Sequence, residues 1–162
     1  MKPAAAVILF FCAFLFQHTA AGLICAGGAG PDLLLVVTVF SVFSFPHING
    51  VIAGAAGIAA LQELCFSIYG GPGTAAVLLS GLSAAAAKRL FSWERPLFLF
   101  PFTAAVTLVY HLTLWGGERI LGSPYSFTYL LKLQPLYIGY NLAAMGILYL
   151  LFIKNKESRS QI

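Results

Sequence analysis

The sequence predicts an all-α integral membrane protein that forms a single domain of six transmembrane helices. Of its 162 residues, 60% are hydrophobic and 9% are charged, whereas about a quarter of the residues in soluble domains are charged. Stretches without Asp, Glu, Lys or Arg cover residues 3–31, 33–62, 64–87, 96–117 and 133–153. About 20 mostly apolar residues cross a bilayer core. This composition excludes a nucleic-acid-binding module, a secreted disulfide scaffold and a cytosolic enzyme.

The first expected span covers about residues 4–25. A cleaved signal peptide is the competing interpretation, because Lys2 precedes an apolar stretch and small residues follow at Ala20–Gly22. The apolar stretch continues past Gly22, which favours an uncleaved membrane anchor.

The next stretch without charges is too long for one helix, and Pro46 interrupts it. Proline lacks a backbone N–H and clashes with the preceding helical turn, so we expect spans at about 31–45 and 49–68. The residues Gly70-Gly71-Pro72-Gly73 predict a turn. The remaining spans are expected at about 73–88, 96–115 and 135–153.

The basic residues support six spans with both termini in the cytoplasm. Seven of the nine Lys and Arg residues lie at the N-terminus, in the 88–95 loop or in the 154–162 tail. Six spans place all three segments on the cytoplasmic side, as the positive-inside rule requires. The 116–134 segment then lies outside. It is rich in apolar and aromatic residues, and two interpretations remain open: residues 125–133 lie along the membrane interface, or they begin the sixth helix early.

Small residues indicate how the helices pack. Helices in lipid associate through close backbone contact and a few polar interactions. Gly50, Gly54 and Gly57 share one face of the third expected span, and Ile52, Ala56 and Ala59 share the opposite face. We therefore expect this span to be packed on both sides, in the centre of the bundle.

Polar residues recur at one depth in the outer half of the membrane. Ionisable residues inside a span are costly and are candidate functional residues. The expected spans bring Glu63, His111 and Asn141 to similar depths, with Gln17-His18 beside them and Asp32 at the outer surface just above. This polar layer has two possible roles: hydrogen bonds that fix the helix order, or a pocket open to the outside for a ligand or a partner's helix.

The sequence gives little support for catalysis, and we expect a protein that is not an enzyme. A G-x-S-x-G elbow, a phosphate-binding loop and a close pair of carboxylates are all missing from it. The histidines lack metal-binding spacing, so neither a metal site nor a cofactor is expected.

The order of several motifs resembles the rod shape-determining protein MreD family of bacteria. These motifs are Pro31-Asp32-Leu33 at the start of the second span, Gly50-x-x-x-Gly54-x-x-Gly57 leading to Gln62-Glu63, the Tyr69–Gly73 turn, the basic 88–95 loop, and Leu130-x-x-x-x-Pro135 followed by Asn141 and Tyr149. The resemblance extends from about residue 31 to the end of the chain. One departure is Glu63, where the family commonly has Asp.

The resemblance implies a non-catalytic component of the cell-elongation (rod) complex in the bacterial inner (cytoplasmic) membrane, surrounded by membrane lipid. Its implied partners are the periplasmic scaffold MreC, the glycosyltransferase and transpeptidase that synthesise lateral-wall peptidoglycan, and, indirectly, the MreB filament. No nucleic acid is implied. We expect Asp32, Glu63 and Asn141, together with the 116–134 surface, to shape the contact with MreC.

The alternative is the substrate-binding subunit of an energy-coupling-factor vitamin transporter, a fold to which the family is similar. Such subunits bind ligands from the outer side, where the polar layer is expected. They usually carry an A-x-x-x-A pattern in the first helix, which docks the energising module. In the first span here, no two alanines are four residues apart, which favours the scaffold.

Overall fold

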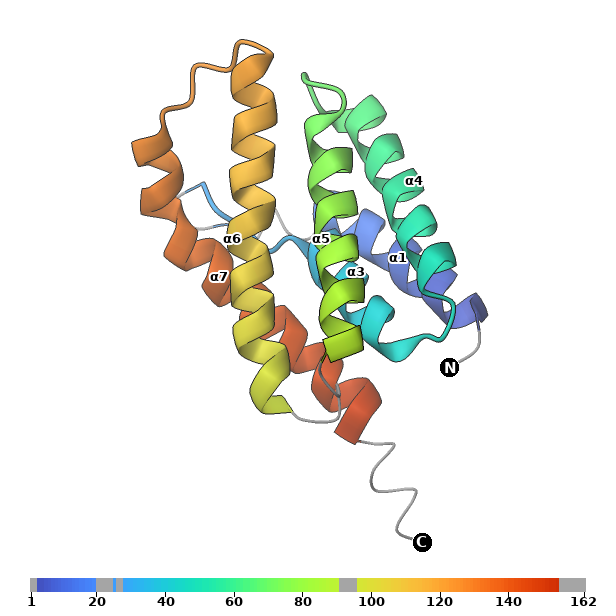
Figure 1. Ribbon diagram of the computed structural model, residues 1–162. Coiled ribbons are helices and arrows are strands. Elements are labelled where there is room, and N and C mark those ends of the chain that lie inside the picture. The colour runs from blue at the N-terminus through green and yellow to red at the C-terminus, as the bar shows by residue number, and fades with distance from the viewer. Residues whose placement is uncertain (1–2, 20–24, 26–27, 91–95, 155–162) are drawn as a thin grey trace, which may run out of the picture.

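The computed structural model describes residues 3–19, 25, 28–90 and 96–154, and within this part of the chain the fold is all-helical (Figure 1). The helices are α1 (Pro3–Thr19), α3 (Leu33–Ser44), α4 (Ile48–Phe66), α5 (Pro72–Leu90), α6 (Pro96–Ile120) and α7 (Phe127–Tyr149), which continues as the π-helical segment η1 (Leu150–Lys154).

Three helical stretches are long and apolar enough to cross a membrane: Ile48–Phe66, Phe98–Ile120 and Phe127–Phe152. Large apolar side chains also lie on the outside of the bundle, with Leu64 86% and Val7 69% exposed. Apolar surface of this extent is typical of a protein that contacts lipid or a partner. The chain is therefore a membrane protein.

The centre of the bundle is α3, although it has only 12 residues. Ten of them, Leu34 to Phe43, are buried, and α3 contacts α1, α4, α5, α6 and α7. At 1.5 Å per residue, this helix is about 18 Å long. It begins part-way along the bundle, beside the middle of α6 (Figure 1). Because its neighbours cover it, α3 does not have to cross lipid by itself.

The helix α4 is peripheral, contrary to the expectation that it would be packed on both faces. Ala55 and Ala59 are buried against the bundle. On the other face, a Cβ atom added at Gly50, Gly54 or Gly57 would meet nothing within 4 Å. The sequence shows that both faces carry small residues, but it does not show whether lipid or another helix covers a face.

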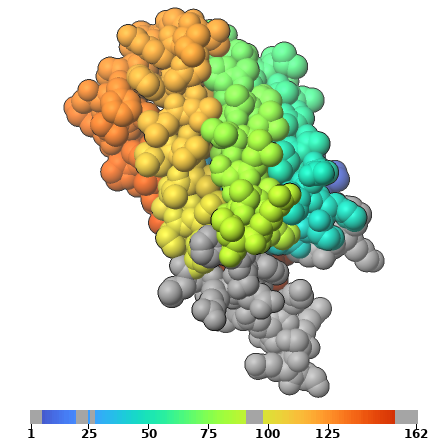
Figure 2. Space-filling view, viewed as in Figure 1, coloured from blue at the N-terminus to red at the C-terminus, as the bar shows by residue number. Residues whose placement is uncertain are grey.

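The breaks between helices lie close to those expected. The helix α3 ends at Ser44 and α4 begins at Ile48, so Pro46 lies between them. The turn before α5 contains Gly71, whose φ of 114° is in the left-handed region that favours glycine. Beyond this turn α5 packs closely on α6: a Cβ atom on Gly117 would lie 2.9 Å from the Pro72 side chain. Figure 2 shows the side chains of the two helices meeting along this face.

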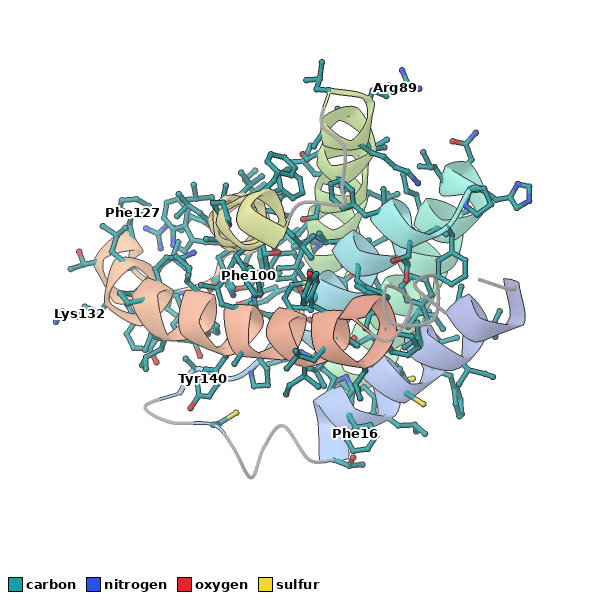
Figure 3. All side chains as sticks on the ribbon, turned by 90° about the horizontal axis from the view of Figure 1, so that it is seen from below. Phe16, Arg89, Phe100, Phe127, Lys132 and Tyr140 are labelled. Atoms are coloured by element: carbon teal, nitrogen blue, oxygen red, sulfur yellow. The ribbon has the colours of Figure 1, made fainter. Side chains whose placement is uncertain are left out.

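The last helix begins eight residues earlier than the expected start at residue 135, because α7 starts at Phe127. The Ser126 side chain caps it by accepting a hydrogen bond from the Tyr129 N–H. Residues 127–133 therefore form the first turns of the last helix, which is the second of the two interpretations of the 125–133 segment. Figure 3 views α6 nearly end-on, whereas α7 runs across the picture from Phe127, so the two helices are not parallel.

Several expectations lie outside the described residues. They concern Lys2, the small residues at Ala20–Gly22, the 91–95 part of the basic loop, and the 155–162 part of the C-terminal tail.

Candidate functional site

A closed ring of polar contacts joins α6, α7 and the start of α3. Thr107 and His111 lie one turn apart on α6, and the His111 Nδ1 atom is 2.9 Å from the Thr107 carbonyl oxygen. The Asn141 amide donates to Thr107 Oγ1 at 3.1 Å and accepts from the Asp32 backbone N–H at 2.8 Å. Asp32 Oδ2 lies 3.0 Å from His111 Nε2 and closes the ring. We call Asp32, Thr107, His111 and Asn141 the polar ring.

Two of these contacts involve the His111 ring. Its Nδ1 atom faces the Thr107 carbonyl oxygen and its Nε2 atom faces the Asp32 carboxylate, so both ring nitrogens lie against an oxygen atom. The imidazole is therefore fixed in orientation between its own helix and the start of α3.

The ring also supplies hydrogen-bond partners for the N-terminus of α3. The first N–H groups of a helix have no partner within the helix. Here the Asp32 N–H donates to Asn141 Oδ1 at 2.8 Å, and the Leu33 N–H donates to Gln17 Oε1 on α1 at 2.7 Å. The Asp32 carboxylate is also favourable at this positive end of the helix. One short buried helix is thus attached to both α1 and α7.

The polar ring is internal. The Asn141 side chain is fully buried, His111 is 4% exposed, and the Asp32 side chain is 16% exposed. Asp32 itself was expected at the outer surface above the polar layer, but it lies within the ring. Groups buried to this extent present almost no surface to a partner's helix, and the contacts between them fix the order of the helices.

Glu63 lies apart from the ring, in the last turn of α4 and next to the N-terminus of α5. Its carboxylate accepts hydrogen bonds from the N–H groups of Gly71, Gly73 and Thr74 and from the Thr74 hydroxyl. These N–H groups are at the N-terminus of α5, where a negative charge is stabilising. Gly73 allows this contact, since a Cβ atom there would lie 2.9 Å from Glu63 Oε1. The structure thus gives Glu63 the role of capping α5.

The two residues expected beside the layer on α1 also differ in position. Gln17 is joined to the ring through Leu33. The His18 ring instead stacks on Phe66 at the end of α4, with centroids 3.9 Å apart and an interplanar angle of 14°.

Two contributors were not identified from the sequence. Thr107 completes the ring, and a signal for it exists: Thr103, Thr107 and His111 are spaced four residues apart and therefore share one face of α6. Lys88 was interpreted only as a topological signal. Its Nζ atom donates to the Val42 and Phe45 carbonyl oxygens at 2.8 Å each, at the C-terminus of α3. A cation there satisfies carbonyl groups that have no partner within the helix.

A cavity of about 260 Å³ lies between α6 and the start of α7. Its walls include His111, Trp115, Glu118, Tyr129 and Tyr137. The His111 and Tyr137 rings are stacked, with centroids 4.0 Å apart and an interplanar angle of 30°. The cavity therefore adjoins the polar ring through His111.

A second hollow, of about 310 Å³, is a groove between α1 and α4. Val7 and Phe10 of α1 line one side, and Gly50 and Gly54 of α4 line the other. The groove is almost entirely apolar, and one side of it is the open glycine face of α4.

Comparison with known proteins identifies no relative: no family model, curated protein or solved structure matches this chain.

Proposed function

We propose that the chain is a non-catalytic scaffold of the bacterial cell-elongation (rod) complex, which binds a partner's transmembrane helix in the inner membrane. The observation that carries the proposal is the glycine face of α4, which the bundle leaves uncovered. Gly50, Gly54 and Gly57 form this face, and no atom lies within 4 Å of a Cβ position on any of them.

A transmembrane helix is the occupant that such a face fits best. In lipid, small residues spaced four apart let two backbones approach closely, and close packing drives helix association. The α1–α4 groove extends the face and is apolar enough for a helix buried in hydrocarbon. The resemblance to the MreD family names MreC as the nearest partner, with the lateral-wall glycosyltransferase and transpeptidase beyond it and the MreB filament linked indirectly.

The polar ring has a supporting role in this proposal. It holds α3, α6 and α7 in a fixed arrangement, so that α4 and α1 present a rigid groove. The sequence alone led us to expect that the polar residues and the 116–134 surface form the partner contact. Asn141 and His111 have almost no exposed surface, so we propose the groove as the binding surface instead.

We also propose that the chain crosses the membrane six times, with both termini in the cytoplasm. The clustering of positive charge supports this topology. Lys88 and Arg89 lie in the last turn of α5, and α1 begins and η1 ends at the same end of the bundle (Figure 1). The positive-inside rule assigns that end to the cytoplasm.

The test is recovery of the partner with a tagged full-length protein purified from its native membrane in mild detergent. Gly54→Leu adds a side chain to the open face, at a position where a Cβ atom meets nothing within 4 Å, and its bulk blocks the groove that Gly54 lines. We expect recovery of MreC to fall about tenfold, the equivalent of about 1.4 kcal/mol. The matched control is Gly139→Leu on α7, which also enters open space and leaves recovery unchanged. Equal recovery with both variants contradicts the proposal.

The cavity beside the polar ring favours a second candidate, a substrate-binding subunit of an energy-coupling-factor transporter. Ligand sites in membrane bundles lie between helices and combine aromatic walls with a few polar groups, as this cavity does. The same purification separates the two candidates. Recovery of a pair of ATP-binding-cassette proteins with a coupling subunit, in place of MreC, identifies the transporter.

A further inference from the structure

We propose that the cavity between α6 and α7 binds a small organic ammonium cation. The inference is independent of partner binding through α4, because the cavity and the glycine face lie on different helices. Three features of the cavity carry it: aromatic walls, a carboxylate that has no counter-ion among the described residues, and a suitable size.

The aromatic walls come from both helices and the loop between them. They are formed by Trp115, Tyr125, Tyr129 and Tyr137. The Trp115 indole N–H donates to the Tyr125 carbonyl oxygen at 3.1 Å, which fixes the orientation of the indole. The Tyr125 and Tyr129 rings are nearly parallel, at 18°, with centroids 5.8 Å apart. Ammonium groups bind to the faces of such rings, and cages of several rings recognise alkylated ammonium ions.

Glu118 supplies the negative charge. It lies one helical turn beyond Trp115 and lines the cavity. Among the described residues, its carboxylate makes no hydrogen bond or ion pair: the neighbouring Arg119 guanidinium donates instead to the Ser123 carbonyl oxygen at 3.0 Å. A partly buried carboxylate without a counter-ion is costly. A cation in the cavity removes this cost.

The imidazole on the cavity wall belongs to His111 and already has an acidic partner. Its Nε2 atom lies 3.0 Å from Asp32 Oδ2, so a second acidic side chain lies directly behind this part of the wall. The cavity also suits a small ion in size, because its volume of about 260 Å³ is below the range of about 300–1,000 Å³ typical of drug-sized ligands. The same chemistry has two sources: a free ammonium compound, or the ethanolamine or choline headgroup of a membrane lipid.

Trp115 is a built-in reporter. The chain has two tryptophans, so Trp93→Phe leaves Trp115 as the sole fluorophore. The full-length protein is purified in maltoside micelles, which contain no ammonium group, and titrated with tetramethylammonium. We expect saturable quenching of Trp115 fluorescence. The uncharged isostere of choline, 3,3-dimethylbutanol, should give none.

Two substitutions test the named groups. Glu118→Gln keeps the shape and removes the charge, and should weaken binding at least tenfold. Tyr129→Leu removes one ring and should weaken it about threefold to tenfold. The matched control is Tyr140→Leu, which alters α7 outside the cavity (Figure 3) and should leave affinity unchanged. Circular dichroism verifies that each variant retains its helices.

Equal quenching by the uncharged isostere, or unchanged affinity in Glu118→Gln, overturns the proposal. The source is assigned by competition with short-chain lipids. Displacement of tetramethylammonium by dihexanoylphosphatidylethanolamine but not by dihexanoylphosphatidylglycerol supports the site and assigns a lipid headgroup. If neither lipid displaces tetramethylammonium and its binding is saturable, the site exists and its ligand is a free ammonium compound.

Discussion

Substitution of Asn141 by Ala tests the polar ring most severely, because Asn141 joins α7 to both α3 and α6. The change removes a hydrogen bond from the Asp32 N–H and another to Thr107 Oγ1. Thr107 Oγ1 still donates to the Thr103 carbonyl oxygen at 2.8 Å. The Asp32 N–H, in contrast, loses its acceptor.

The expected cost follows from these partners. A buried donor left without an acceptor costs about 1–3 kcal/mol, and the fully buried site keeps water from replacing the amide. Single hydrogen bonds between membrane helices couple by about 0.6 kcal/mol on average. We therefore expect Asn141→Ala to lower the free energy of unfolding by about 1–3 kcal/mol, and we expect a double-mutant cycle with Thr107→Val to show a coupling of about 0.6 kcal/mol.

The assay is reversible unfolding in mixed micelles, with sodium dodecyl sulfate as denaturant and circular dichroism as the signal. Asn49→Ala is the matched control, because Asn49 is exposed in the first turn of α4. It should change the free energy of unfolding by less than about 0.5 kcal/mol. A value for Asn141→Ala that equals the control would refute the view that the ring holds α3 in place.

Three further predictions concern the ends of the central helices and the topology. Lys88→Met removes two hydrogen bonds to carbonyl oxygens at the end of α3 and should cost about 1–3 kcal/mol in the same assay; a neutral result contradicts the capping role. Gly73→Ala places a Cβ atom 2.9 Å from the Glu63 carboxylate and should destabilise the protein by about 1–3 kcal/mol, whereas Gly70→Ala, which meets no atom within 4 Å, should cost less than about 1 kcal/mol. In a protein without other cysteines, Ser92→Cys should react with an impermeant maleimide only from the cytoplasmic side, and labelling from outside would rule out six spans.

The sequence predicts the helix breaks well, because their causes are local. Proline at position 46 and the Gly70–Gly73 turn act on the backbone directly, and α4 and α5 begin within one residue of the expected starts. The start of α7 was expected eight residues late. Apolar and aromatic residues in 125–133 suit both a helix and a membrane interface, and composition does not distinguish the two.

The polar contacts could be predicted only in part. Counting residues along the spans brings His111 and Asn141 to one depth, and the structure places them in one ring. Depth does not determine partners, however. Glu63 lies in the last turn of α4 and accepts hydrogen bonds from three backbone N–H groups at the start of α5, and this contact depends on how the chain reverses direction after α4.

Helix burial was the least predictable feature. A helix that is apolar all round suits lipid and a protein interior equally. The sequence therefore does not show that α3 is central, or that the glycine face of α4 stays open. Both follow from the tertiary arrangement, in which polar side chains and a lysine satisfy the two ends of a short helix.

The central claim is that a partner's transmembrane helix lies against the glycine face of α4, and site-specific photo-crosslinking in the native membrane tests it most directly. A photoreactive residue is placed in turn at Gly50, Gly54, Gly57 and Gly139, all of which face open space. We predict cross-links to the membrane helix of MreC from the three positions on α4 and none from Gly139 on α7. Cross-links from Gly139 alone, or none from α4 while the complex is intact, would contradict the claim.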